Sequence, residues 1–346
     1  MTSEVGVEAV RPVLDRGVLV LSVDTELAWG HAHVRPTPAV DATGERAVIA
    51  AALEVLDRHG IPATWAVVGH LFLEGCAPVG GRAHPEILRP GGWDAAAGDG
   101  AEDWFAVDPG GTAADHPGYY GPDVVEAIAT CPTAQEIGSH SFSHMDAGNP
   151  HCTAAAFASE LDRSREVAAA AGVELRSFVF PRNSIGHLDL LAPHGFRAFR
   201  GPRPTPFASS EPAARRVQRL VDKVVPLHGS AVWPSRRVDG LWDIPQTVLF
   251  APAEGRRRHL PVEVWSWGPR RRIAQAARTR SLVHLWLHPS NLADDPERGI
   301  AALERICRDA ARRRDAGRLD VCSMGDLVSL LEERLRPPDD DPGCAG

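Results

Sequence analysis

Two histidines in the stretch SHSFSHMD are the clearest candidates for chemistry in this chain. His140 and His144 lie four residues apart after a short apolar segment, and an HxxxH spacing places two imidazoles on one face of a helix, where they can bind a metal ion together. The chain has 15 histidines, so this spacing alone is also consistent with two imidazoles on a surface turn. The interpretation depends on which groups other segments supply.

Three further ionisable residues follow apolar segments elsewhere in the chain. Asp24 and Glu26 lie at the end of VLVLSVD, two residues apart and pointing the same way if the extended geometry continues, and His288 follows SLVHLWL. Two imidazoles and one carboxylate leave a divalent ion with open positions, which is the catalytic pattern. A second carboxylate can accept a proton from water, and another histidine can protonate a leaving group. The set predicts metal-assisted hydrolysis.

The elements that must position these residues alternate between strands and helices. Residues 18–24 read as a buried parallel strand, residues 45–59 as a helix capped by Gly60, and residues 63–69 as the next strand. Further strands are predicted at 135–139, 176–181, 196–200, 240–246, 281–287 and 319–323, with helices at 153–172, 187–195 and 324–335. Because the candidate residues follow well-separated strands, we expect a distorted (β/α) barrel of seven or eight units, in which strand ends converge on one face.

One segment departs from this alternation. Residues 70–134 are rich in glycine, proline and aromatic residues and show little periodicity, which is typical of a functional loop. We predict a lid insertion over the active face, with a surface loop that has no role as the alternative. The expected organisation is an N-terminal extension (1–16), a single barrel domain (17–335) and a disordered acidic tail (336–346).

Composition excludes several classes of protein. The chain of 346 residues has a net charge of −8, which disfavours nucleic acid as a partner. It has no 18-residue apolar run, so no membrane span is expected, and its start lacks a signal-peptide pattern, which predicts a cytoplasmic protein. The six cysteines form no CxxC pair, so neither a cysteine zinc site nor a disulfide framework is indicated. The oligomeric state is not indicated by the sequence.

Four ordered motifs resemble those of the polysaccharide deacetylases (the NodB-homology domain, carbohydrate esterase family 4). They are SVDTELAWG, EIGSHSFSHMD, FVFPRNSIGHLDLLAPHGF and LVHLWLHPSNL, and the resemblance runs from about residue 17 to about residue 330. It implies a distorted (β/α) barrel that removes acetyl groups from N-acetylated amino sugars with a divalent metal, most often Zn²⁺.

The resemblance also implies roles for individual residues. Asp24 matches the catalytic base, His140 and His144 match two metal ligands, His288 matches the general acid, and Arg182 resembles the arginine that orients the base.

The sequence departs from the family pattern at two motifs. The position of the usual second aspartate, a metal ligand, is Thr25, so Glu26, Asp146 or a water molecule is left as the third ligand, with Glu26 preferred. In the third motif Pro181 precedes Arg182, which leaves the register of Pro181, Arg182 and Asn183 open.

Two other classes of function compete with the deacetylase. One is a catalytically silent carbohydrate-binding protein on the same fold, which the missing aspartate favours. The other is a glycoside hydrolase that uses Asp24 and a distant acid, but this reading leaves the histidines unexplained.

Overall fold

The computed structural model describes residues 14–31, 40–93, 102–202, 231–252 and 258–335. Most of the predicted N-terminal extension and the whole predicted acidic tail lie outside these ranges. Within the described residues, no helix is long and apolar enough to cross a membrane.

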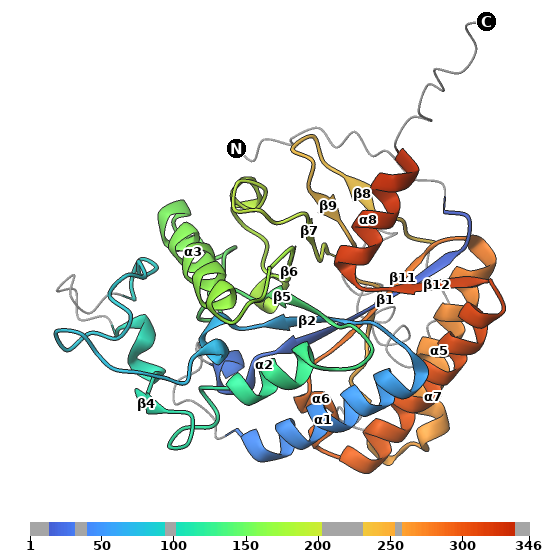
Figure 1. Ribbon diagram of the computed structural model, residues 1–346, viewed down its shortest axis with the longest axis horizontal. Helices are drawn as coiled ribbons and strands as arrows, with labels where there is room; N and C mark the ends of the chain where they lie inside the picture. The colour runs from blue at the N-terminus through green and yellow to red at the C-terminus, as the bar shows by residue number, and fades with distance from the viewer. Residues whose placement is uncertain (1–13, 32–39, 94–101, 203–230, 253–257, 336–346) are drawn as a thin grey trace, which may run out of the picture.

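Ten strands form one curled sheet at the centre of the molecule (Figure 1). In the order β10-β11-β1-β2-β5-β6-β7-β9-β8, with β12 also pairing with β1, every pair is parallel except β8 with β9. The strands are β1 (Gly17–Thr25), β2 (Thr64–Val67), β5 (Glu136–Ser139), β6 (Ser177–Phe178), β7 (Ala198–Phe199), β8 (Ser235–Arg236), β9 (Trp242–Asp243), β10 (Val248–Leu249), β11 (Leu282–Leu287) and β12 (Leu319–Cys322).

The sheet forms a distorted barrel, as predicted. An isolated antiparallel bridge between Val232 and Leu282 links the segment before β8 to β11, while β8 and β10 stand at the two ends of the described strand order. In the middle, β1 pairs along its length with β11, and Val23 lies opposite Leu287. The carboxyl ends of β1 and β11, which carry Asp24 and His288, are therefore adjacent.

Helices cover the outside of the sheet. They are α1 (Ala42–His59), α2 (Pro122–Ala129), α3 (Ala154–Ala170), α5 (Val262–Thr279), α6 (Ser290–Ala293), α7 (Pro296–Asp315) and α8 (Met324–Leu335). Figure 1 shows α5 and α7 side by side, with α1 and α2 along the adjoining edge. The Asp41 side chain caps the start of α1, and Gly60 ends it with a left-handed φ of 58°, which confirms the predicted C-cap.

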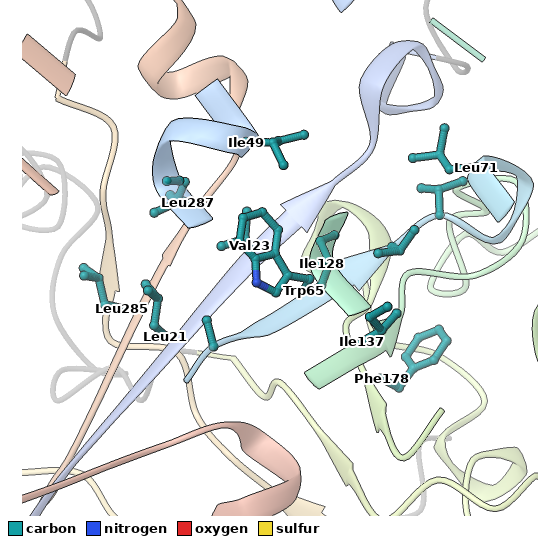
Figure 2. Packing of buried hydrophobic residues seen from close by; sticks show 14 of the residues in the cluster. Leu21, Val23, Ile49, Trp65, Leu71, Ile128, Ile137, Phe178, Leu285 and Leu287 are labelled. Atoms are coloured by element: carbon teal, nitrogen blue, oxygen red, sulfur yellow. The ribbon is translucent and has the colours of Figure 1, made fainter. Parts of the chain in front are cut away.

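The hydrophobic core lies between this helical layer and the sheet. Figure 2 shows Val23 of β1, Trp65 of β2 and Leu287 of β11 close to Ile49 of α1. Full burial of such side chains contributes roughly 1.5–3 kcal/mol each, so the strands that carry the site are held by the main core.

The prediction of a helix over residues 187–195 was wrong. Only a 3₁₀ turn, η6 (Leu188–Leu190), forms there, and it begins at His187 in a left-handed conformation with φ of 50°. Pro193 and Gly195 interrupt the periodic apolar pattern that suggested the helix, because proline cannot donate a backbone hydrogen bond and glycine favours turns.

The insertion has its own small structure. It contains the two-stranded pair β3 (Gly75–Cys76) and β4 (Gly111–Thr112) and the 3₁₀ turn η4 (Trp104–Val107), and it projects from one side of the barrel in Figure 1. Trp104 and Phe105 are buried in the main core, whereas Trp93 and Tyr119 are only partly buried. The described part of the insertion is thus a packed element, and its action as a lid stays a prediction.

Candidate active site

Asp24 is held by an arginine that sequence reasoning missed. Its carboxylate accepts two hydrogen bonds from Arg200, 2.6 Å to Nη1 and 2.7 Å to Nη2, and both side chains are almost completely buried. Arg200 directly follows β7 and also donates to Oδ1 of Asn183 at 3.1 Å. Burial raises the pKa of Asp24, but the charge and hydrogen bonds of Arg200 and the charge of His288 outweigh it and hold the pKa below the usual value. Asp24 is therefore an ionised carboxylate.

Arg200 is also held by contacts with residues of β1 and β11. Its guanidinium stacks on the Trp286 ring at 4.3 Å, and Nη1 donates to Ser22 Oγ at 3.2 Å. Ser22 in turn contacts Nε2 of the fully buried His284 at 2.9 Å. Burial and the neighbouring Arg200 charge lower the pKa of His284 to about 3, so its ring is neutral and adds no positive charge beside the guanidinium.

The structure does not place Arg182 beside the base. Its side chain is half exposed and lies 3.5 Å from Asp146, in a turn where Arg182 and Asn183 both have positive φ. The predicted contact to Asp24 is made by Arg200 instead. A signal for Arg200 was present in the sequence, since it ends the predicted strand 196–200 just as Asp24 ends the first strand.

Glu26 joins the two histidines of the HxxxH motif. Its Oε1 lies 3.0 Å from Nε2 of His140 and 3.1 Å from Nε2 of His144. Asp146, the other carboxylate considered as a third ligand, contacts Arg182. The three donor atoms of Glu26, His140 and His144 lie within 4.8 Å of one another and form a candidate metal site.

The tautomer of His140, which its hydrogen bond to Val179 selects, suits a cation between His140 and Glu26. Nδ1 of His140 lies 2.7 Å from the carbonyl oxygen of Val179, which only accepts, so Nδ1 carries a proton. In the neutral ring Nε2 then presents a lone pair to the Glu26 carboxylate, and two acceptors face each other. A bound cation satisfies both. Ligand atoms about 2.0–2.1 Å from a tetrahedral zinc ion are about 3.3 Å apart, close to the distances observed.

The pKa shifts of His144 and Glu26 also agree with a bound cation at this group. Burial lowers the pKa of His144, which keeps its imidazole neutral, as a metal ligand must be. Burial raises the pKa of Glu26, but the electrostatic influence of the neighbouring His144 and His140 outweighs it, and the pKa lies well below the usual value. Glu26 therefore offers a negative oxygen.

The two histidines lie on a strained turn, not on a helix as their spacing suggested. Ser141 and His144 both have left-handed φ, 57° and 60°. The turn is held by the buried Glu160 of α3, whose carboxylate accepts the backbone N–H groups of Phe142 and Ser143 at 2.8 Å each and the Ser143 hydroxyl at 2.6 Å. A remote buried acid thus fixes the direction of both imidazoles.

His288 faces both carboxylates from the end of β11. Its Nε2 lies 3.6 Å from Oδ2 of Asp24 and 3.5 Å from Oε1 of Glu26, and its Nδ1 contacts Asn291 at 3.2 Å. Burial lowers the pKa of His288, but the hydrogen bond and charge of Glu26 and the charge of Asp24 outweigh it and raise the pKa to about 9. His288 can therefore carry a proton at neutral pH.

Five of the six predicted site residues thus come together from three separated segments. Asp24 lies near the end of β1 and Glu26 follows it, His140 and His144 follow β5, and His288 follows β11, while Arg182 stands apart. The arrangement places a candidate metal-binding group, an ionised carboxylate and an imidazole that can carry a proton on one barrel face.

Comparison with known proteins supports the same family. Residues 40–192 match the model of the polysaccharide deacetylase family. No curated protein matches the chain. A solved candidate polysaccharide deacetylase from Mycobacterium smegmatis has 16% identity and a TM-score of 0.58, with 96% of this chain and 97% of that chain covered.

Two further solved structures share the fold. A PuuE allantoinase has 13% identity and a TM-score of 0.54, with 94% and 93% of the two chains covered. A GH57-type branching enzyme from Pyrococcus horikoshii has 10% identity and a TM-score of 0.51, with 90% of this chain and 70% of that chain covered.

The predicted resemblance to this family is borne out over the matched segment, residues 40–192. This segment contains His140, His144 and Arg182, whereas Asp24, Glu26 and His288 lie outside it. For those three residues the geometry of the site is the stronger argument, because structural likeness at such low identity shows the fold alone.

Proposed function

We propose that this member of the polysaccharide deacetylase family is a divalent-metal-dependent hydrolase that removes acetyl groups from N-acetylated amino sugars. One observation carries the proposal: Asp24 and His288 face each other at 3.6 Å beside the group of Glu26, His140 and His144. Hydrolysis of an amide needs a proton acceptor for water and a proton donor for the departing nitrogen, and both must lie at the same carbonyl.

Each residue has a defined task in this reaction. The ion, which Glu26, His140 and His144 would hold, supplies Lewis-acid activation of the amide carbonyl and of the attacking water. Asp24 accepts a proton as the water oxygen attacks the carbonyl carbon. His288 gives a proton to the amide nitrogen as the carbon–nitrogen bond breaks, so acetate and a free amine leave. Arg200 keeps Asp24 ionised and orients its carboxylate toward His288.

The ligand set favours zinc among the divalent metals. Two imidazoles and a carboxylate are a frequent catalytic zinc set, and they leave a position open. An amide carbonyl on a sugar is our preferred substrate because that is the chemistry of the matched family. We propose a cytoplasmic location, where sugar nucleotides, oligosaccharides and glycoconjugate precursors are the accessible substrates.

A substrate panel with two readouts tests the proposal. The zinc-loaded and the metal-stripped protein are each incubated with N-acetylglucosamine oligomers, nucleotide-linked N-acetylglucosamine and allantoin, which is included because an allantoinase shares the fold. Released acetate and new primary amines are measured together for the sugars, with an assay of reducing ends beside them, and allantoin is followed by its disappearance. We expect equal amounts of both from an amino sugar and loss of both after metal removal.

The other outcomes distinguish the competing functions. Amino-sugar binding without acetate release would favour a silent carbohydrate-binding protein. New reducing ends without acetate would indicate a glycoside hydrolase. Turnover of allantoin alone would keep the amide hydrolase but overturn the sugar substrate.

A further inference from the structure

A second cluster of metal-ligand side chains lies in the insertion, outside the group that Asp24 and His288 face. Four donor atoms converge there, from His70, Cys76, His84 and Asp108, and all lie within 4.8 Å of one another. We call these four residues the second cluster. None of them has a task in the proposed hydrolysis.

The donor atoms are in mutual contact. Nε2 of His70 lies 3.1 Å from Nε2 of His84, and Oδ2 of Asp108 lies 3.2 Å and 3.0 Å from these two nitrogens. Sγ of Cys76 lies 3.2 Å from the same carboxylate oxygen. The side chains of His70 and Asp108 are fully buried and that of His84 is 5% exposed, whereas Cys76 is partly buried, so three of the four side chains are shielded from bulk water.

The outer nitrogens of both rings fix the inner ones as lone pairs. Nδ1 of His70 lies 2.9 Å from the carbonyl oxygen of Tyr119, and Nδ1 of His84 lies 3.4 Å from the carboxylate of Glu86. Both partners are acceptors, so each Nδ1 carries the proton and each Nε2 of a neutral ring does not. Two bare nitrogens at 3.1 Å repel each other unless a cation or an extra proton lies between them.

Charge balance favours a divalent cation over an extra proton. Two neutral imidazoles, one carboxylate and one thiolate carry a charge of −2, which a divalent ion neutralises within a buried site. Binding would release the Cys76 thiol proton to solvent, and no other bond changes. With an extra proton on one imidazole instead, the Cys76 thiol keeps its own proton and donates to Asp108, so two protons are shared among four convergent atoms.

The ligand types and their number select the metal and its role. Mixed imidazole, thiolate and carboxylate ligands suit zinc, and four protein ligands without an open position are the structural pattern. Hydrogen bonds support the ligands from outside, since Asp108 Oδ1 accepts the Gly110 N–H at 2.9 Å and Cys76 Sγ lies 3.1 Å from the Tyr120 hydroxyl. This is the outer support that metal ligands usually have.

The second cluster connects three short segments of the insertion that little regular secondary structure holds together. It joins η2 (Gly69–Phe72) at the end of β2 to β3 and to the residues after η4, within an insertion whose strands are two residues long. His84 is held with φ of 45°. The rings of His70 and His84 also pack on Phe142 at 5.5 Å and 5.0 Å, and Phe142 belongs to the turn between His140 and His144.

We propose that His70, Cys76, His84 and Asp108 bind a structural zinc ion that fixes the insertion to the barrel beside the histidine turn. This site is separate from the proposed catalytic metal, and it could form in an active deacetylase or in a silent binding protein.

Cobalt substitution distinguishes the two metal sites, because only the second cluster contains a sulfur ligand. The full-length protein is stripped of metal and reloaded with Co²⁺. We expect two equivalents of Co²⁺ in the wild type and a thiolate-to-cobalt charge-transfer band in its near-ultraviolet spectrum. The His140→Ala/His144→Ala variant should keep one equivalent and the band, and Cys76→Ser should lose the band.

A second cysteine serves as the matched control. Cys131 is also a partly buried free thiol, and it lies outside the cluster, so Cys131→Ser should keep both equivalents and the band. If Cys76→Ser fails to fold, alkylation of the wild type decides the question. Zinc should protect Cys76 and leave the rate at Cys131 unchanged, with modified residues mapped by mass spectrometry.

Three results would overturn the proposal. They are a wild type that binds only one equivalent without the band, a band that survives Cys76→Ser, and a Cys76 alkylation rate that zinc does not change. In the first case, loss of the single equivalent in His140→Ala/His144→Ala would assign that ion to the proposed catalytic site and rule out a metal at the second cluster.

Discussion

Asp24 and Arg200 are 176 residues apart in the sequence, yet they form two buried hydrogen bonds of 2.6 Å and 2.7 Å at the ends of β1 and β7. Removal of one partner from such a pair leaves an uncompensated charge and costs about 3–5 kcal/mol. The pair also fixes the direction of the carboxylate toward His288. Arg200 is thus a positioning residue for the proposed base.

Arg200→Lys tests this relationship without removing the charge. A lysine offers no planar pair of donors, so the carboxylate loses one of its two fixed hydrogen bonds. We expect kcat to fall at least about tenfold, by roughly 1.4 kcal/mol in barrier, with a smaller change in KM and no loss of bound metal. Steady-state kinetics and metal analysis measure these quantities.

Arg197→Lys is the matched control for this substitution. Arg197 lies three residues earlier, is partly exposed and pairs with Glu332, so its kinetics should stay near wild type. A kcat for Arg200→Lys equal to that of this control would contradict the positioning role.

The acid and base can be tested individually. Asp24→Asn and His288→Asn should each lower kcat by about 10²–10⁴-fold, the usual effect of one acid–base group, while metal content is retained. His259→Asn changes an exposed histidine and should leave kcat unchanged. A loss below about tenfold at either site residue would count against its assignment.

Most of the strands, though not their order in the sheet, and five residues of the candidate site could be predicted from the sequence. Buried parallel strands are continuous apolar runs, so 18–24 and 281–287 were recognisable, and their ends place Asp24 and His288 at one face. The helix at 187–195 could not be excluded by periodicity, since tertiary packing and turn residues set the local conformation there.

Long-range partners were beyond the reach of spacing. The sequence places Arg200 at the end of a predicted strand, but its pairing with Asp24 follows only once β7 and β1 share a sheet. The contact of Glu160 with the histidine turn follows only once α3 packs on that turn. Cys76 was set aside because no second cysteine lies near it, but the fold supplies two histidines and an aspartate instead. Such groups come from separate segments, which no local motif records.

The third ligand of the proposed catalytic metal is tested by Glu26→Gln. The amide keeps the shape of the side chain but removes the negative charge that faces His140 and His144. We expect at least tenfold weaker metal binding at this site, measured by calorimetric titration of a protein that already carries Cys76→Ser. Unchanged affinity would assign the third position to water or to another residue.

Asp243 makes the stability of the fold depend on pH. Its Oδ1 is buried without a hydrogen-bond partner among the described residues, and burial raises its pKa to about 7, with a smaller opposing effect of Arg237. The folded state therefore holds a proton that the unfolded chain releases near pH 4. The contribution to the free energy of unfolding is complete below about pH 4 and is lost as pH rises to about 7.

Asp243→Asn removes this titration while preserving shape. We expect the variant to gain on the order of 1–3 kcal/mol over the wild type at pH 8 and little or nothing at pH 4. Urea unfolding at both pH values measures the difference. Asp189→Asn, at an exposed position, should show no pH-dependent gain. An equal effect of Asp243→Asn at both pH values would contradict the buried-proton explanation.

Glu160 should control the histidine turn from outside the site. Glu160→Gln replaces one carboxylate oxygen by an amide NH₂, which then faces a donor among the two N–H groups and the hydroxyl that Glu160 binds. A buried hydrogen-bonding group left without its partner costs about 1–3 kcal/mol, so the unfolding midpoint should fall. Because the turn carries both imidazoles, metal affinity at His140 and His144 should fall with it.

Glu166→Gln, on the same helix, removes a surface ion pair with Arg163 worth about 0–1 kcal/mol and should leave metal affinity unchanged. A Glu160→Gln variant that loses stability but binds metal as tightly as Glu166→Gln would show that the turn keeps its shape without this carboxylate.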